Sequence, residues 1–240
     1  MRRLRNQPKR EMVGAYPLRA RIDYHRMLLE IDFQAPQVHA LEEALSARID
    51  APVQRLTLSE LHWIIAQLLV RDGASRIQLA EKCSQCASIL ELELDIGHAV
   101  EAAEPALRRG SGDARLRLPT TTDLECANRA EELVARCSLE PIELAEADRI
   151  LQDADPLGLI ELRALCCICG GTVEGSVDLA AKWLTLERQS ALDLLEEIHT
   201  LARNYHWSER EILELSDISR RRYIEMCRAE DFSRELEQNV

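Results

Sequence analysis

The sequence predicts a mainly α-helical protein with a small β element, that is, an α+β fold. Apolar residues recur every three to four positions from Thr57 to Asp72 and again from Asp178 to Tyr205, which predicts two amphipathic helices. Apolar and acidic residues alternate along Leu90–Ile96, as in a strand with one buried face. A second extended stretch, Leu159–Leu165, leads into another pair of cysteines. The β element is therefore predicted to consist of two hairpins, one in each half of the chain.

Turn residues and composition divide the chain into regions. Residues 1–20 lack periodicity and are rich in arginine, and the run Arg109–Asp113 contains the best internal linker. We expect six regions: a disordered basic arm (1–20), an N-terminal helical half with the first cysteine pair (21–108), a linker (109–117), helices with the second cysteine pair (118–178), a C-terminal helical region (179–228) and a polar tail (229–240).

Capping signals place the helices of the second half. The run Pro119–Cys137 predicts one helix with a capped start, and Pro141–Leu151 predicts a shorter one. Ser208–Glu211 has the spacing of a capping box, in which a serine and a glutamate satisfy backbone donors reciprocally. Asp217 or Ser219 is expected to cap the last helix.

The net charge of −12 is distributed unevenly along the 240 residues. Residues 1–26 hold eight arginines and lysines against two carboxylates, a charge of +6, which leaves −18 for the rest. An acidic body repels phosphate backbones, so broad nucleic-acid binding by the folded part is not expected. The basic arm is either a solvated terminus or a segment that docks on an acidic partner or on nucleic acid.

No apolar run is long enough to cross a membrane, and the first residues lack the apolar stretch of a secretory signal. The sequence therefore predicts a cytoplasmic protein that does not contact membranes. In a reducing compartment, the eight cysteines are expected to be metal ligands or small buried residues rather than disulfides.

Two Cys-x-x-Cys pairs, Cys83/Cys86 and Cys166/Cys169, predict a metal site. Zinc prefers thiolate ligands, and a two-residue spacer lets one tight turn place two sulfurs on the same edge of a tetrahedron. Two such turns complete a site with four thiolate ligands. We therefore predict one structural zinc ion bound by these four residues.

The two cysteine regions also share their surroundings. Aligning the two pairs brings Glu91 onto Glu174 and Asp95 onto Asp178, with extended sequence on both sides of each pair. This pattern is typical of a zinc ribbon made of two hairpins, here contributed by the two halves of the chain. A site closed by four thiolates has no open coordination position for water or substrate, so the zinc is expected to join the halves and not to catalyse a reaction.

Alternatives remain for the cysteines. The pairs could be reduced and buried, or form a redox dithiol, although a redox Cys-x-x-Cys needs a helix N-terminus and these lie between extended segments. Cys167 could replace Cys166 as a ligand. Cys126, Cys137 and Cys227 fall on predicted helical faces and are expected in the core.

Other polar residues offer weaker signals. His199 and His206 could be ligands or a base, but surface histidines are the simpler interpretation. Arg220, Arg221 and Arg222 form the one basic cluster of the acidic body, either a solvated helix face or a contact with an acidic partner. No glycine-rich phosphate loop and no recognisable Ser/His/Asp arrangement is present.

The stretch Leu195–Leu215, followed by Arg220–Tyr223, resembles the C-terminal signature of the baseplate hub assembly chaperone family of T-even-type phage tails and related contractile injection systems. The segment Leu118–Leu124, the dipeptide Arg136–Cys137 and the two cysteine pairs are similar to the same family. The resemblance covers about residues 57–227.

The cysteine turns depart from the family in two respects. Similar proteins often carry glycine directly after the second cysteine, which Gly170 satisfies and Ala87 does not. Cys167 is an additional thiol between the two ligands of the second pair.

The resemblance implies a non-enzymatic assembly factor, or chaperone, or a minor structural component of the baseplate hub of a contractile tail or tail-like injection system. Its partners would be hub or other tail proteins, and it would act in the cytoplasm or be incorporated into the particle. Tyr205, His206 and Trp207, at a helix junction, are candidate partner contacts together with the three arginines, and core packing is the alternative for the aromatic residues.

Two other functions compete with this one. The first is a zinc-ribbon regulator that binds nucleic acid through its basic arm. The second is a thiol redox enzyme, which would require reversible oxidation of a cysteine pair without metal.

Overall fold

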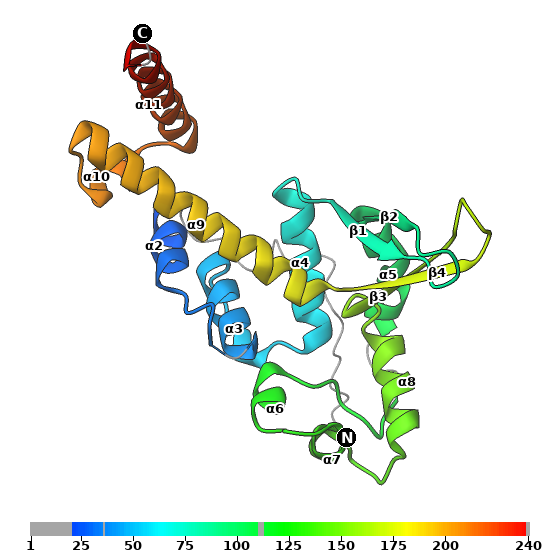
Figure 1. Ribbon diagram of the computed structural model, residues 1–240. Coiled ribbons are helices and arrows are strands. Elements are labelled where there is room, and N and C mark those ends of the chain that lie inside the picture. Colours follow the sequence, from blue (N-terminus) through cyan, green and yellow to red (C-terminus); the bar gives the residue numbers. More distant parts are fainter. Residues whose placement is uncertain (1–20, 36, 110–112, 239–240) are drawn as a thin grey trace.

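The computed structural model describes the backbone of residues 21–35, 37–109 and 113–238 and the side chains of 23–229 within these ranges, so the predicted basic arm lies outside the described residues. Helices dominate, and two antiparallel two-stranded sheets accompany them, which confirms the predicted mainly α fold with a small β element (Figure 1). No helix in the described part of the chain is long and apolar enough to span a membrane.

Two copies of one helix–hairpin–helix unit form the body of the molecule. The first unit consists of α4 (Leu58–Arg71), β1 (Arg76–Lys82), β2 (Ile89–Asp95) and α5 (Ile96–Arg109). The second unit consists of α8 (Leu144–Ala154), β3 (Leu159–Leu165), β4 (Thr172–Asp178) and α9 (Leu179–Tyr205). Each strand of the second hairpin starts 83 residues after its counterpart, at 159 against 76 and at 172 against 89. The likeness of the two halves therefore extends beyond the cysteine pairs to the whole unit.

The same side chain starts the last helix of each unit. Asp95 accepts a hydrogen bond from the backbone N–H of His98 at 3.0 Å, and Asp178 accepts one from that of Ala181 at 2.9 Å. A carboxylate at this position satisfies an orphan amide and interacts favourably with the helix dipole. Strand and helix consequently follow each other without a loop in both units.

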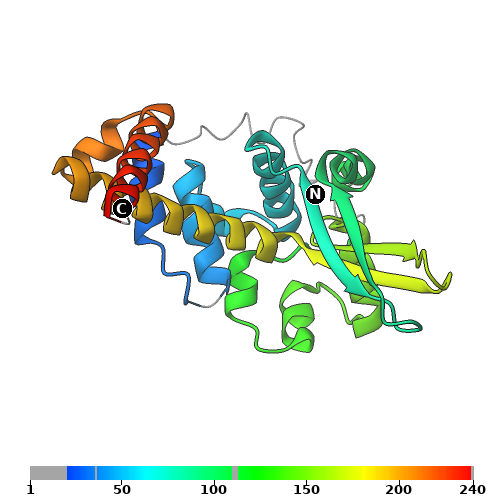
Figure 2. The same ribbon diagram turned by 45° about the horizontal axis from the view of Figure 1, so that its top comes forward.

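The two units are interlocked. The first helix of each packs against the last helix of the other, α4 on α9 and α8 on α5, while β1 lies beside β4 and β2 beside β3 (Figure 2). The main core lies chiefly between α3, α4, α5 and α9. Its fully buried side chains include Leu45, Ile64, Ile65, Leu68, Ile96, Leu179 and Trp183.

In the described residues before the first unit, the chain forms α2 (Arg21–Glu30), α3 (Gln37–Arg48) and the 3-10 turn η1 (Val53–Arg55). The sequence predicted a helical region here but located no helix before Thr57. Arg48 at the end of α3 forms an ion pair with Glu187 of α9 at 3.0 Å, and Glu187 also accepts a hydrogen bond from the Tyr24 hydroxyl of α2 at 2.9 Å. Both helices are thereby held on α9.

Two short helices connect the units: α6 (Thr121–Glu125) and α7 (Ala130–Cys137). The predicted single helix from Pro119 to Cys137 is therefore wrong, because the chain turns between α6 and α7. Its predicted start is close, since Thr120 and Asp123 form a capping box. Thr120 also forms a β-bridge with Thr57, which joins the connection to the start of α4.

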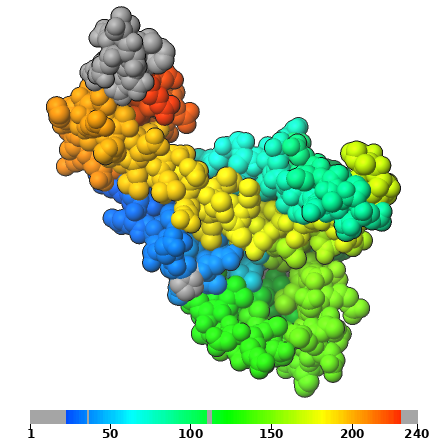
Figure 3. All heavy atoms as spheres, viewed as in Figure 1, coloured from blue at the N-terminus to red at the C-terminus, as the bar shows by residue number. Residues whose placement is uncertain are grey.

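Beyond the body, α9 continues to a C-terminal group with α10 (Glu209–Glu214) and α11 (Asp217–Gln238), as Figure 3 shows in yellow, orange and red. The predicted capping box of Ser208 and Glu211 is confirmed. Most of the predicted polar tail, 229–240, belongs to α11, which continues to Gln238. A separate apolar cluster holds the group together: Leu201, Ile212, Ile224 and Cys227.

Candidate metal centre

The turns of the two hairpins have the same backbone structure. The N–H of Ala87 donates a hydrogen bond to the carbonyl of Cys83 at 2.9 Å, and the N–H of Gly170 donates one to the carbonyl of Cys166 at 2.8 Å. Ala87 and Gly170 both have a left-handed backbone, with φ of 61° and 74°. Both turns consequently close tightly after their second cysteine.

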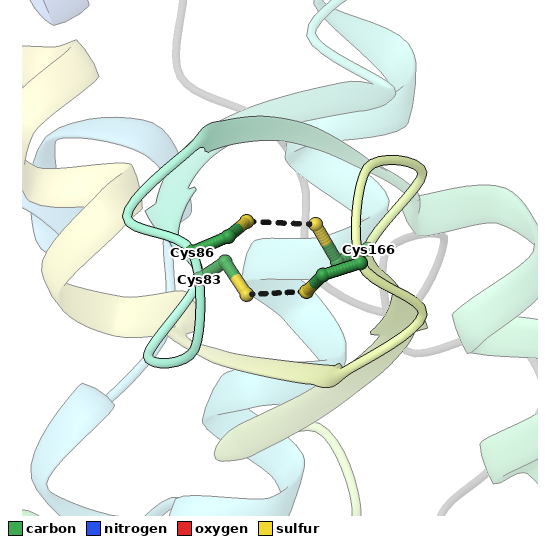
Figure 4. A group of neighbouring side chains, drawn as sticks. Cys83, Cys86 and Cys166 are labelled. Atoms are coloured by element: carbon green, nitrogen blue, oxygen red, sulfur yellow. Dashed lines mark hydrogen bonds between the residues drawn. The ribbon is translucent and has the colours of Figure 1, made fainter.

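The four predicted ligands converge where the turns meet. Figure 4 shows Cys83 and Cys86 of the first turn facing Cys166 of the second. The Sγ atoms of Cys83, Cys86, Cys166 and Cys169 all lie within 4.8 Å of one another. The pairs Cys83–Cys169 and Cys86–Cys166 are each 3.6 Å apart, and each joins one hairpin to the other. Zinc bound to four thiolates at about 2.3 Å requires sulfur separations of about 3.8 Å, so these residues fit one tetrahedral ion.

Burial varies around the site. Cys83 and Cys166 are buried, Cys86 is half-buried and Cys169 is exposed, and all four are free thiols. Cys167 is exposed and lies outside the cluster, so Cys166 is the residue that joins it. Within the described residues this is the one group of three or more histidine, cysteine or acidic side chains placed to hold a metal ion.

Ser88 adds a polar group to the site. Its Oγ lies 2.9 Å from the sulfur of Cys86 and 3.3 Å from that of Cys166. Hydrogen bonds from Ser88 and from the backbone amides of Cys169 and Ile168 lower the pKa of Cys166 to about 6. The backbone N–H of Gly171 lowers the pKa of Cys169, but burial and the neighbouring thiols outweigh it and raise this pKa to about 12. The surroundings of the cluster therefore shift the pKa values of Cys166 and Cys169 in opposite directions.

The remaining cysteines divide into two groups. Cys137 and Cys227 are buried, as predicted. Cys126 is exposed, so its predicted core position is wrong. It is the C-cap of the five-residue helix α6 and does not belong to a helix face.

The aromatic residues at the end of α9 pack on one another. The rings of Tyr205 and Trp207 stack with centroids 4.8 Å apart, and both meet the ring of Tyr223 edge-on, at 5.4 and 5.0 Å. His206 between them is exposed and ends α9 with a left-handed backbone of φ 56°. The structure thus places Tyr205 and Trp207 against the C-terminal apolar cluster, which agrees with the core-packing alternative.

The three arginines have different environments. Arg220 is only 4% exposed and binds Glu197 and Asp217, each at 2.9 Å. Its predicted partner contact is therefore wrong, because its guanidinium joins α11 to α9 within the chain. Arg221 and Arg222 are exposed and stay candidates.

Sequence reasoning did not identify the polar pair of His62 and Asp155. Nδ1 of His62 lies 2.7 Å from a carboxylate oxygen of Asp155, and both side chains are largely buried. The pair joins α4 to the end of α8. The one signal in the sequence was a histidine within the apolar stripe of α4. Neither it nor the exposed His199 belongs to a metal-binding group.

Comparison of the chain with protein-family models, with curated proteins and with solved structures found no match.

Proposed function

We propose that the four cysteines hold one structural zinc ion that joins the two units. The observation that supports this is the convergence of four sulfurs, two from each hairpin, at separations that suit a tetrahedral ion. The donor set is closed, so the bound ion supplies structure and no open Lewis-acid position. With 79 residues between Cys86 and Cys166, a shared ion restrains segments that are distant along the chain.

Substitution of single cysteines tests this site. Cys166→Ser removes a proposed ligand, whereas Cys167→Ser and Cys126→Ser change exposed thiols outside the cluster. We expect one zinc per chain in protein purified without chelators, a strong loss in Cys166→Ser and full content in the two controls. Elemental analysis together with thiol titration measures this. Zinc far below one equivalent in the unaltered protein, or equal zinc in all three variants, would contradict the site.

We further propose that the chain is a non-enzymatic assembly chaperone, or a minor component, of the baseplate hub of a contractile tail or tail-like injection system. Support comes from the resemblance of Leu195–Leu215 and Arg220–Tyr223 to that family, and from the closed ligand set. These residues build the C-terminal group at one end of the molecule (Figure 1). In this proposal the metal centre maintains the body, and the exposed surface of the C-terminal group contacts hub proteins.

The arginines allow a test that separates binding from folding. Arg221→Glu and Arg222→Glu change exposed side chains, whereas Arg220→Met removes a buried ion pair. We expect the double exposed variant to lose co-purification with hub proteins at an unchanged melting temperature, and Arg220→Met to melt earlier. Retention of hub binding by the double variant would contradict this surface. Binding to nucleic acid that weakens steeply with salt would instead favour the regulator.

A further inference from the structure

A groove of about 480 Å³, here called the α7–α8 groove, is lined by α7, by the loop 138–143 that leads to α8 and by Leu144 at the start of α8; Figure 1 shows the two helices. Its apolar lining includes Val134, Leu139, Ile142 and Leu144. Leu139 is 73% exposed and Leu144 is 40% exposed, so the groove presents apolar surface that no described residue covers. Leu139 is the most exposed of the large apolar side chains in the described part of the chain.

The rim of this groove is acidic. Glu131, Glu140 and Glu143 line it, and its lining contains no arginine, lysine or histidine. None of the three carboxylates forms an ion pair with a described residue. The groove between α9 and α11 differs, because Arg221 and Arg228 contribute to its lining. The α7–α8 groove therefore offers apolar surface and uncompensated negative charge together.

We propose that the N-terminal arm, residues 1–20, binds in the α7–α8 groove of its own chain. The arm carries six cationic side chains against the single carboxylate of Glu11. They are Arg2, Arg3, Arg5, Lys9, Arg10 and Arg19. Apolar residues are interspersed among them: Leu4, Met12, Val13, Tyr16 and Leu18. The arm thus matches the groove in both charge and apolar character.

The arm is long enough to reach the groove from the start of α2. The arm joins α2 at Arg21, and a continuous series of contacts leads from α2 to α3, from α3 to α6 and from α6 to α7. Twenty extended residues reach about 65 Å. Because the arm is tethered, its effective concentration at the groove is high, on the order of millimolar. Individual surface ion pairs contribute little, so several cations and the apolar contacts act together.

The scarcity of lysine makes the contact measurable. The chain contains only three lysines, Lys9, Lys82 and Lys182, and Lys9 alone lies in the arm. A carbodiimide joins amines to carboxylates that already touch. In dilute full-length protein we expect Lys9 to cross-link mainly to Glu131, Glu140 or Glu143, within one chain. The other two lysines serve as internal references for the extent of reaction.

Two variants complete the test. Leu139→Asn keeps the three carboxylates, adds no charge and removes apolar contact, so we expect at least a fivefold loss of Lys9 cross-links to the groove. Leu192→Asn alters a half-exposed leucine on α9 and should leave them unchanged. Three results would overturn the proposal: Lys9 cross-links scattered over the exposed carboxylates of the body, cross-links only between differently labelled chains, or equal yields in Leu139→Asn and the unaltered protein.

Discussion

At the residue scale, Ala87 and Gly170 occupy equivalent positions in the two cysteine turns, and both have positive φ. A left-handed backbone costs a residue with a side chain about 1–2 kcal/mol and costs glycine almost nothing. A Cβ built on Gly170 meets nothing within 4 Å, so the cost of adding one there is conformational and not steric. The turn geometry is retained at Ala87 although glycine is absent.

Substitutions at the two positions should change the free energy of unfolding in opposite directions. Gly170→Ala should lower the free energy of unfolding by about 1 kcal/mol. Ala87→Gly should raise it by less than about 1 kcal/mol, because the unfolded chain also gains freedom. Urea denaturation of the metal-loaded protein measures both. If both substitutions lower the free energy of unfolding to the same extent, the left-handed backbone at these two positions does not determine the stability of the turns.

Asp123 gives the clearest pH dependence. The two terminal guanidinium nitrogens of Arg117, Nη1 and Nη2, each donate to its carboxylate at 2.6 Å, and the backbone N–H of Thr120 donates at 2.9 Å. Arg117, opposed by burial and assisted by Thr120, holds the pKa of Asp123 far below its usual range. A depressed pKa in the folded state contributes stability above the unfolded value of about 4, which is lost as the pH falls towards the folded one.

Asp123→Asn should therefore reduce the free energy of unfolding by about 1.5–3 kcal/mol at neutral pH. The difference from the unaltered protein should begin to shrink as the pH falls below about 4, because the carboxyl of the unfolded chain then takes up a proton while that of the folded chain remains ionised. Chemical denaturation between pH 3 and pH 8 tests this, with Glu131→Gln as the exposed control. A difference that is independent of pH would contradict the role of the charge.

At the element scale, the sequence located elements whose periodicity was strong and local. The hairpins were predicted because strand alternation and the cysteine turns agree, and α9 because its apolar stripe is long. By contrast, α3 buries Ala40, Leu41, Glu42, Ala44, Leu45 and Ala47. These residues face several directions, so no single stripe marks the helix, and tertiary packing decided its fold. No glycine or proline lies between α6 and α7, so no helix-breaking residue in the sequence indicated the end of α6.

The four cysteines of the candidate site could be predicted from the sequence, whereas polar contacts between distant residues could not. Each cysteine pair is contiguous in sequence, so the spacing alone identified the four residues that converge. The contact of His62 with Asp155 joins residues 93 positions apart, and nothing local indicates it. Arg220 could not be separated from Arg221 and Arg222, because only the packing of α11 on α9 decides which arginine is buried.

Trp207 tests the C-terminal group as an element. Its ring packs on Tyr205 and Tyr223, so Trp207→Ala should destabilise the packing of α10 and α11 on α9 by about 3 kcal/mol. Hydrogen exchange should rise in these helices and stay unchanged in α4, which belongs to the main core. Loss of hub binding without any change in exchange or melting would instead make Trp207 an interface residue.

At the scale of the whole molecule, two separate features hold the units together. The main core lies between helices of both units, whereas the four cysteines of the proposed metal centre lie only at the turns of their hairpins. Around the four sulfurs the apolar cluster is small, with Cys83, Cys166 and Val173 as its buried members. Packing at the helices is therefore extensive, and packing at the hairpin turns is not. A bound ion should therefore stabilise the hairpin turns more than it stabilises the helices of the main core.

Removing the metal should separate these two contributions. We expect a chelator to increase hydrogen exchange in β1–β2 and β3–β4 together, because each hairpin supplies only half of the ligands and neither can keep the ion alone. Amides of α4 and α9 within the main core should remain protected, since their packing does not involve the site. Hydrogen exchange followed by mass spectrometry resolves the four segments, and readdition of zinc should restore both hairpins equally. Loosening of one hairpin alone would mean that the ion belongs to that unit and does not join the two.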